Sequence, residues 1–148
     1  MTANYHDFTA SLIKSFRANQ GRMPDGPFKD RQVLLLTTVG AKSGTIRTTP
    51  LAYTMDGGHW VIVASKGGSD THPAWYLNLL ANPRATIEVG GDTVPVLARP
   101  TKGDERRRLY DQHAELHPGF KDYELKTSRE IPAIVLERTD QAGPTPVG

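Results

Sequence analysis

Cysteine is absent from this 148-residue sequence. Without it the chain can form no disulfide, no thiolate metal site and no cysteine nucleophile, and a reducing compartment is permitted. Long apolar runs are absent too: none approaches the ~20 residues of a membrane-spanning helix, and no apolar signal core follows the N-terminus. We therefore expect a cytoplasmic protein without a membrane span.

The sequence also lacks a strong excess of charge of one sign. Lysine and arginine number 18 against 16 aspartates and glutamates, for a formal net charge of +2. No long basic run alternates with aromatic residues, so we predict no nucleic-acid groove. Of the five histidines, only His113 and His117 have helical i, i+4 spacing. Because no third ligand lies near them in the sequence, we predict no metal site.

Three common catalytic or nucleotide-binding motifs are missing. The chain contains no phosphate-binding Walker loop, no G-x-G-x-x-G fingerprint and no G-x-S-x-G elbow. A protein without an evident acid, base or nucleophile suits a cofactor that carries its own chemistry, while the protein supplies binding and orientation.

Turn residues are abundant, with 14 glycines and 11 prolines. They separate short extended segments, which run at about residues 34–39, 49–55, 60–64, 85–89, 94–98 and 131–136. Most of these segments follow one another without the helical crossovers that parallel pairing requires. We predict about six strands in an antiparallel barrel whose first two hairpins form a meander. With flanking helices this is an α+β fold, in a single domain over residues 1–148.

Helical patterns lie between these strands. Residues 4–20 carry apolar side chains at spacings of three and four behind Asn4 as N-cap, which predicts an amphipathic helix packed on the domain. A membrane surface is the alternative for its apolar face. Pro73 suits the first turn of a second helix, and Thr101 is the predicted N-cap of a third. Arg106, Arg107 and Arg108 point in three directions around this third helix, so we expect a solvated basic face, with a ligand site as the alternative. The polar tail, about residues 139–148, is expected to fray.

Two turns of small residues carry lysines. Residues 40–44 (GAKSG) contain Lys42 and are followed by Arg47, and residues 65–68 (SKGG) contain Lys66. Such turns can present backbone N–H groups and cations to a phosphate or a carboxylate. The alternative is a pair of ordinary turns whose cations stay in water, and the residues alone leave both open.

Three segments in order carry a resemblance to a known family: LLLTTVGAKSGTIRTTPL, VIVASKGG and HPAWYLNLLANP. Together they resemble the deazaflavin-dependent nitroreductase family, the A-type flavin/deazaflavin oxidoreductases of actinobacteria. The resemblance covers about residues 33–136. It implies a split β-barrel related to the flavin-binding pyridoxamine-phosphate oxidase fold. It also implies reduced coenzyme F-420, an 8-hydroxy-5-deazaflavin with a phospholactyl-polyglutamate tail, as hydride donor.

The resemblance assigns cofactor contacts position by position. Lys42 and Arg47 match residues that hold the phosphate and the glutamate carboxylates of the coenzyme. Trp75 and Tyr76 match an aromatic pair beside the cofactor, whereas the residues alone favour a core role for both rings. The segment that lines the deazaflavin ring and the second turn supply the other matches: Thr49, Pro50, Leu51, Ala64, Ser65, Lys66, Gly67 and Gly68.

The resemblance also places an acceptor pocket. Nitroimidazole-reducing relatives carry three tyrosines at i, i+3 and i+6, where this chain has His117, Phe120 and Tyr123. Only Tyr123 keeps a phenol, so we expect a quinone or another activated alkene, rather than a bulky nitroimidazole, as the preferred acceptor. Ser65 is the predicted donor to the charge that develops on the acceptor, and Ser65 and Tyr123 are the predicted catalytic residues.

Two other functions stay open on the sequence. The same fold could bind FMN, which has one phosphate and therefore needs fewer cations than the deazaflavin tail. A split barrel could also bind a cofactor or heme without turnover. The protein could be a monomer or a homodimer.

Overall fold

The computed structural model describes residues 5–24, 26 and 28–147. Asn4, the predicted N-cap, lies outside them. The main elements are α1 (Tyr5–Ala18), β1 (Val33–Val39), β2 (Ile46–Ala52), β3 (Thr54–Asp56), β4 (His59–Val63), α2 (Ala74–Ala81), β5 (Arg84–Val89), β6 (Asp92–Pro100), α3 (Gly103–Leu116), α4 (Gly119–Leu125) and β7 (Ala133–Arg138). A short 3-10 turn, η1 (Lys66–Gly68), follows β4.

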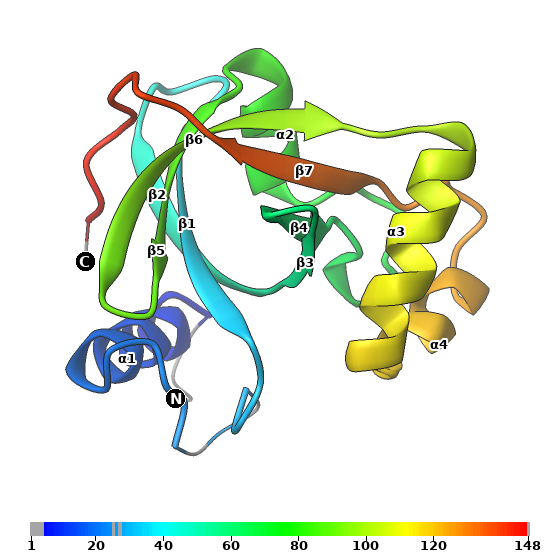
Figure 1. Ribbon diagram of the computed structural model, residues 1–148, viewed down its shortest axis with the longest axis horizontal. Coiled ribbons are helices and arrows are strands. Elements are labelled where there is room, and N and C mark those ends of the chain that lie inside the picture. The colour runs from blue at the N-terminus through cyan, green and yellow to red at the C-terminus, as the bar shows by residue number, and fades with distance from the viewer. Residues whose placement is uncertain (1–4, 25, 27, 148) are drawn as a thin grey trace.

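The strands form one antiparallel sheet in the order β2-β1-β5-β6-β7-β4-β3. Its two edge strands, β2 and β3, are separated in the chain by Tyr53 alone. The sheet must therefore curl back on itself, and Figure 1 shows this half-barrel with α3 and α4 side by side at one end and α1 at the other. The prediction of an antiparallel barrel with flanking helices is confirmed.

The predicted meander is wrong, and the sheet has seven strands because the predicted strand at residues 49–55 is two. Tyr53 still continues the β1–β2 ladder, since its N–H donates to the carbonyl of Gln32, and from Thr54 onward the chain pairs with β4 instead. The β1–β2 and β3–β4 hairpins then pair with β5 and β7 respectively, at opposite ends of the sheet order. A local pattern shows that a segment is extended but not that its partner changes along its length.

Alternation along the strands sorts the apolar side chains into separate cores. Leu34 and Leu36 of β1 face the inside of the half-barrel, whereas Val33 and Leu35 face α1. In the same way Trp60 and Ile62 of β4 point inward. The alternate residues of β4 and β7 point outward and pack against α3 and α4. Leu109, Tyr110 and Ala114 are the α3 side chains in this outer core. Strands covered on both faces explain the continuous apolar runs of the sequence.

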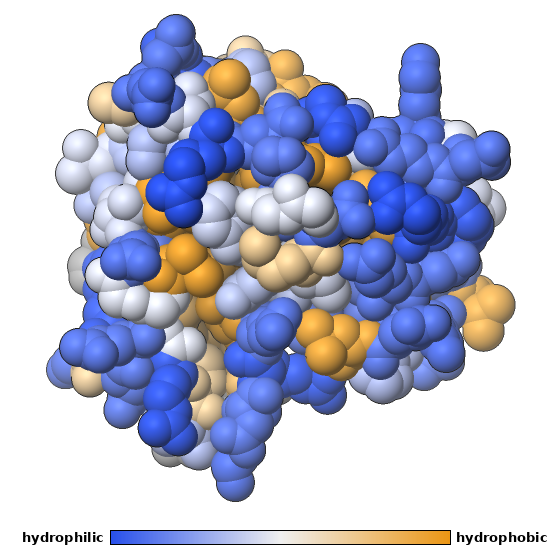
Figure 2. Space-filling view, viewed as in Figure 1, coloured by the Kyte–Doolittle hydropathy of each residue, from blue (hydrophilic) through white to orange (hydrophobic). Residues whose placement is uncertain are grey.

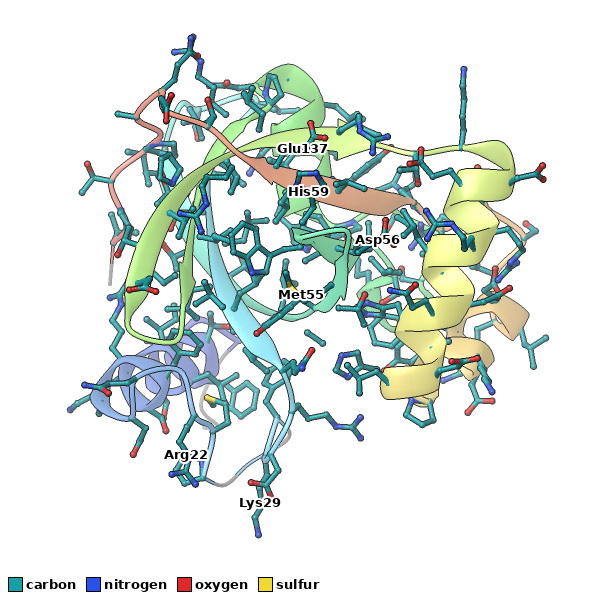
Figure 3. The ribbon with its side chains drawn as sticks, in the orientation of Figure 1. Arg22, Lys29, Met55, Asp56, His59 and Glu137 are labelled. Atoms are coloured by element: carbon teal, nitrogen blue, oxygen red, sulfur yellow. The ribbon has the colours of Figure 1, made fainter. Side chains whose placement is uncertain are left out.

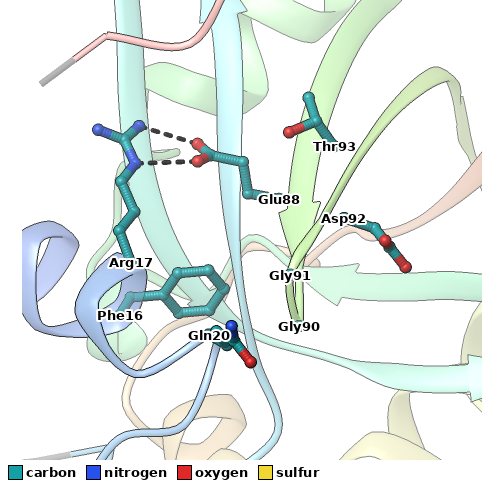
Figure 4. A pocket seen from close by; sticks show the side chains of 8 residues that line it. All are labelled: Phe16, Arg17, Gln20, Glu88, Gly90, Gly91, Asp92 and Thr93. Atoms are coloured by element: carbon teal, nitrogen blue, oxygen red, sulfur yellow. Dashed lines mark hydrogen bonds and ion pairs between the residues drawn. The ribbon is translucent and has the colours of Figure 1, made fainter.

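The first helix packs on the sheet through Phe16, which is 1% exposed, and through an ion pair. Arg17 donates from Nε and Nη2 to the two carboxylate oxygens of Glu88 on β5, both at 2.9 Å (Figure 4). Behind the helix, a side chain at Gly21 would lie 2.7 Å from the Cα of Gly90, in the β5–β6 turn, so only glycine allows this approach. The predicted packing of this helix on the domain is confirmed.

The third helix differs from its prediction at both its start and its basic face. Its N-cap is Lys102, while the Thr101 hydroxyl donates to the carbonyl of Ala133 at 2.7 Å, because β7 lies beside it. Arg106 is buried rather than solvated, and donates to the Ile131 carbonyl at 2.8 Å and to Glu124 of α4 at 3.2 Å.

The outer face of the β3–β4 hairpin is charged. Arg108 of α3 pairs with Asp56 at 2.8 Å, and Asp56, His59 and Glu137 lie along the hairpin and β7 in Figure 3. Figure 2 shows that hydrophilic residues cover most of this face, with separated apolar patches between them. No helix within the described residues is long and apolar enough to cross a membrane.

The polar tail packs against the sheet instead of fraying. Thr86 donates to the carbonyl of Pro144 at 2.6 Å, and Arg17 donates to that of Val147 at 2.8 Å. Gly143 lies so close to β5 that a Cβ there would be 2.6 Å from the Ala85 carbonyl oxygen. The prediction failed because a polar composition does not exclude backbone contacts that only the fold provides.

Candidate functional site

A cavity of about 990 Å³ opens between the edge strand β2, both lysine-bearing turns and the helices α2 and α4. Among the described residues, its lining combines small, apolar and basic side chains and includes no aspartate or glutamate. The residues are Thr9, Phe28, Thr38, Gly40, Ala41, Lys42, Ser43, Arg47, Thr48, Thr49, Pro50, Leu51, Ala52, Val63, Ser65, Lys66, Gly67, Pro73, Ala74, Trp75, Leu77, Asn78, Phe120 and Tyr123.

The first turn, residues 40–44, is closed by its own backbone and held by α2. Gly40 donates to the carbonyl of Thr45 at 2.8 Å, and Gly44, with φ of +72°, donates to that of Gly40 at 3.0 Å. The N–H of Ala41 donates to Oδ1 of Asn78, whose Nδ2 donates to Thr38. Asn78 therefore fixes the turn relative to the helix that forms another wall of the cavity.

The edge strand β2 supplies one wall. Arg47, Thr49 and Leu51 are two residues apart and so share a face of the strand. Pro50 cannot donate a hydrogen bond, which an edge strand tolerates because one side has no partner.

The second turn follows β4 and has an unusual backbone. Lys66, Gly67 and Gly68 all have positive φ, at 47°, 65° and 86°. Ser65 is 6% exposed, yet within the described residues its hydroxyl makes no hydrogen bond, so it is available to a ligand in the cavity. The Nζ of Lys66 lies 3.2 Å from the hydroxyl of Thr71 and remains at the surface.

Aromatic rings close the cavity from two helices. Trp75 of α2 belongs to the inner core and also lines the cavity. Phe120 and Tyr123 of α4 pack on each other with centroids 5.0 Å apart. Apolar walls of this kind can bury a planar ring system.

Electrostatics favour an anionic ligand. Lys42 and Arg47 are exposed, and within the described residues neither forms an ion pair. With Lys66 they place three cations on a cavity that no carboxylate lines in the part of the chain that the structure describes. The same cavity therefore fits both an apolar ring and a tail with several negative charges.

Eleven of the predicted site residues meet in this cavity, and four do not. Ala64 and Gly68 flank the second turn without lining it, and Tyr76 turns toward His72, with ring centroids 4.8 Å apart. His117 is buried behind Phe120, and its Nε2 lies 3.0 Å from the Tyr53 carbonyl oxygen. The i, i+3, i+6 pattern fails here because His117 ends α3, whereas Phe120 and Tyr123 belong to α4.

Sequence reasoning missed other parts of the lining. Asn78 had a usable signal, since a polar residue inside the apolar run WYLNLL needs a hydrogen-bonding partner when buried. Phe28 and Thr9 had none, because they reach the cavity through loop and helix positions that only the tertiary structure defines.

His113 and His117 lie next to Phe120 but do not line the cavity. His113 is 0% exposed, and its Nδ1 lies 3.3 Å from the Thr54 hydroxyl. Burial, with a smaller effect of His117, lowers the pKa of His113 to about 3. Burial also lowers the pKa of His117. Within the part of the chain that the structure describes, no group of three or more potential metal ligands gathers.

Comparison with known proteins identifies the family of the chain. A sequence profile described as F420H(2)-dependent quinone reductase matches residues 10–138. The chain belongs to this family. It is therefore an oxidoreductase, its coenzyme is F-420, and the reaction of the family is hydride transfer from the reduced coenzyme to a quinone.

Individual relatives support the assignment. An F420H(2)-dependent quinone reductase of Mycobacterium tuberculosis H37Rv is 42% identical over 120 residues, which are 79% of this chain and 78% of that protein. The solved structure of an F420-H2 dependent reductase, FDR-A, is 38% identical with a TM-score of 0.67, covering 76% of this chain and all of the other. A structure described as a domain-swapped dimer is 36% identical with a TM-score of 0.69, covering 86% and 93%.

The split-barrel fold extends to more distant proteins. A pyridoxamine 5'-phosphate oxidase-like protein of Listeria innocua has a TM-score of 0.52 at 14% identity, covering 74% of this chain and 85% of that one. This likeness concerns the fold alone and confirms the predicted split-barrel class.

Proposed function

We propose that the cavity of this quinone reductase binds coenzyme F-420 with its ring on the apolar walls and its tail on Lys42, Arg47 and Lys66. The observation that carries this proposal is the presence of these three cations on a largely apolar cavity whose described lining residues include no carboxylate. The reduced coenzyme supplies a hydride from C5 of its deazaflavin, and the protein supplies the binding, orientation and electrostatic stabilisation.

The side chains take separate roles in this proposal. Thr49, Pro50 and Leu51 line one side of the ring, and Trp75 lies on the α2 side. The Ser65 hydroxyl, which has no partner within the described residues, donates to the oxygen of the acceptor as negative charge develops there. Tyr123 presents a phenol from α4 and is the proposed source of the proton.

Quinones fit the acceptor side better than bulky nitroimidazoles. Phe120 and Tyr123 supply apolar ring faces, and Leu77 extends this surface while remaining 47% exposed. A flat quinone can lie against these rings. Other activated alkenes and small nitro compounds are further candidate acceptors.

The direct test is a titration of the protein with reduced coenzyme F-420, followed by addition of menadione. Tight binding and rapid return of the oxidised absorbance are expected. Lys42→Gln and Arg47→Gln should each weaken coenzyme binding by about tenfold, because each removes a charge-assisted contact. The matched control is Lys102→Gln, an exposed lysine outside the cavity lining. Equal affinity in all four proteins would exclude the assigned tail site.

The same variants distinguish the deazaflavin from FMN. FMN carries one phosphate, so it cannot engage three separated cations as fully as a tail with several carboxylates. We expect FMN to bind more weakly and to lose less affinity in the two variants. Preferential binding of FMN or heme, with no oxidation of reduced F-420, would leave the fold assignment intact and refute the function.

Two further proposals concern the assembly state and a contact with the membrane. One similar structure is a domain-swapped dimer, and we propose a homodimer for this chain, to be tested by sedimentation equilibrium.

Phe8, Leu77 and Leu80 are about half exposed on α1 and α2. A peripheral contact of these side chains with a quinone-containing membrane is tested by vesicle co-sedimentation of wild type and Phe8→Ser.

A further inference from the structure

One arginine outside the cavity lining holds the second turn. Arg129 follows α4 and precedes β7, and its half-buried side chain reaches the connection between β4 and α2. Its Nε donates to the Ser69 carbonyl at 2.7 Å. Its Nη2 donates to the carbonyls of Ser65 at 2.9 Å and Ala64 at 3.2 Å. Three carbonyls of residues 64–69 thus share one guanidinium.

The remaining contact of the guanidinium is to a histidine. Nη1 of Arg129 lies 3.0 Å from Nδ1 of His72. Since an arginine nitrogen can only donate, this hydrogen bond requires a neutral His72 with its proton on Nε2. Burial and the charge of Arg129 lower the pKa of His72, which favours that form.

The charge of Arg129 is not neutralised by an ion pair. Within the described residues no carboxylate lies within 4.0 Å of its nitrogens, in contrast to Arg106 and Arg107, which share Glu124. Within the described residues, all four hydrogen bonds of its guanidinium go to residues 64–72. The guanidinium therefore holds a single loop, residues 64–72, and we call these four hydrogen bonds the clamp.

The turn needs such a clamp because its backbone is unfavourable. Lys66 has φ of 47°, a left-handed conformation that costs a residue with a side chain about 1 kcal/mol or more. Within the described residues, two backbone hydrogen bonds close the turn, from the Gly68 N–H to the Ser65 carbonyl and from the Ser69 N–H to that of Lys66. The turn also packs closely against α4, since a Cβ on Gly68 would lie 3.0 Å from the Tyr123 carbonyl oxygen.

We propose that Arg129 is a positioning residue, which holds residues 64–69 in the shape that presents Ser65, Lys66 and Gly67 to the coenzyme. This inference rests on the proposed coenzyme site. Arg129 does not line the cavity, so it acts through the turn rather than by touching the ligand. Because the clamp consists of hydrogen bonds between protein groups alone, it can be tested separately from coenzyme binding.

The test compares Arg129→Lys with wild type, first without coenzyme. A lysine keeps the charge but cannot bond three carbonyls and a histidine at once. We expect the amides of Gly68 and Ser69 to exchange with deuterium at least about tenfold faster, with α3 and β7 unchanged. Reduced F-420 should bind about tenfold more weakly, with the KM for menadione unchanged. The control is Arg99→Lys, which alters an exposed pair with Glu105.

Two further variants guard against misfolding of the lysine variant. In His72→Phe the ring can still pack on Tyr76 but the acceptor of Nη1 is lost, so a smaller increase at the same two amides is expected. In Arg129→Ala, guanidinium ion at low millimolar concentration should restore coenzyme affinity, while sodium chloride should not.

Each outcome bears on a different claim. Unchanged exchange and affinity in Arg129→Lys would overturn the clamp. Faster exchange with unchanged affinity would show a clamp that does not serve the coenzyme, and would overturn the positioning role. If wild type fails to bind reduced F-420, the proposed function fails, and the positioning role fails with it, whatever the exchange rates show of the clamp.

Discussion

Asn78 joins α2 to the first turn and offers a sharp test of the site. Its side chain is 8% exposed and makes two hydrogen bonds, from the Ala41 N–H at 2.9 Å and to the Thr38 hydroxyl at 3.1 Å. Asn78→Leu keeps a similar volume but leaves the Ala41 N–H without its acceptor. The Thr38 hydroxyl, on a residue only 1% exposed, also loses its donor, which costs about 1–3 kcal/mol, and the lost bond of the partly exposed Ala41 N–H costs about 1 kcal/mol. We therefore expect the free energy of unfolding to fall by about 2–3 kcal/mol.

Urea denaturation measures this change, with Asn19→Leu as the control. Asn19 is exposed and its side-chain nitrogen bonds only to the Ser15 carbonyl, so its replacement should change stability by less than about 0.5 kcal/mol. Asn78→Asp separates stability from binding. A carboxylate can still accept from Ala41, but it adds a negative charge to the cavity wall and should weaken F-420 binding more than it lowers stability. A loss in Asn78→Leu no larger than in the control would refute the view that this side chain holds the turn.

Two further predictions concern α3 and α4. The pKa of His113 is lowered to about 3 in the folded protein, against 6.5 for the free side chain, so only the unfolded chain gains a proton as the pH falls between these values. As the pH falls from about 6 to 4, protonation of His113 in the unfolded chain should lower the free energy of unfolding by about 1.4 kcal/mol per pH unit. His113→Leu should reduce this slope, which urea denaturation at a series of pH values measures. The Tyr123 hydroxyl makes no hydrogen bond within the described residues, so Tyr123→Phe should leave Tm within about 1 °C and reduce kcat about tenfold. A lower Tm with normal turnover would assign Tyr123 to packing alone.

Much of this protein could be predicted from local pattern. The turns at residues 40–44 and 65–68 and the hairpins were visible because glycine supplies positive φ at defined positions, such as Gly44 and Gly67. The resemblance of three segments then named the coenzyme and the reaction class, which the family match confirms. Lys42, Arg47 and Ser65 lie on the cavity as the sequence predicted, and their roles remain predictions.

Tertiary structure decided what local pattern could not encode. The change of partner at Tyr53 places β2 and β3 at opposite edges of the sheet, and the edge strand β2 forms one wall of the cavity. The sequence pattern predicts that Arg106 is solvated, but in the tertiary structure α4 packs against α3 and Arg106 is buried beside Glu124. Periodicity reports which side of an element is apolar, whereas a clamp such as Arg129 depends on contacts across about 60 residues of chain. Such contacts exist only in the tertiary structure, because they join segments that lie far apart in the chain.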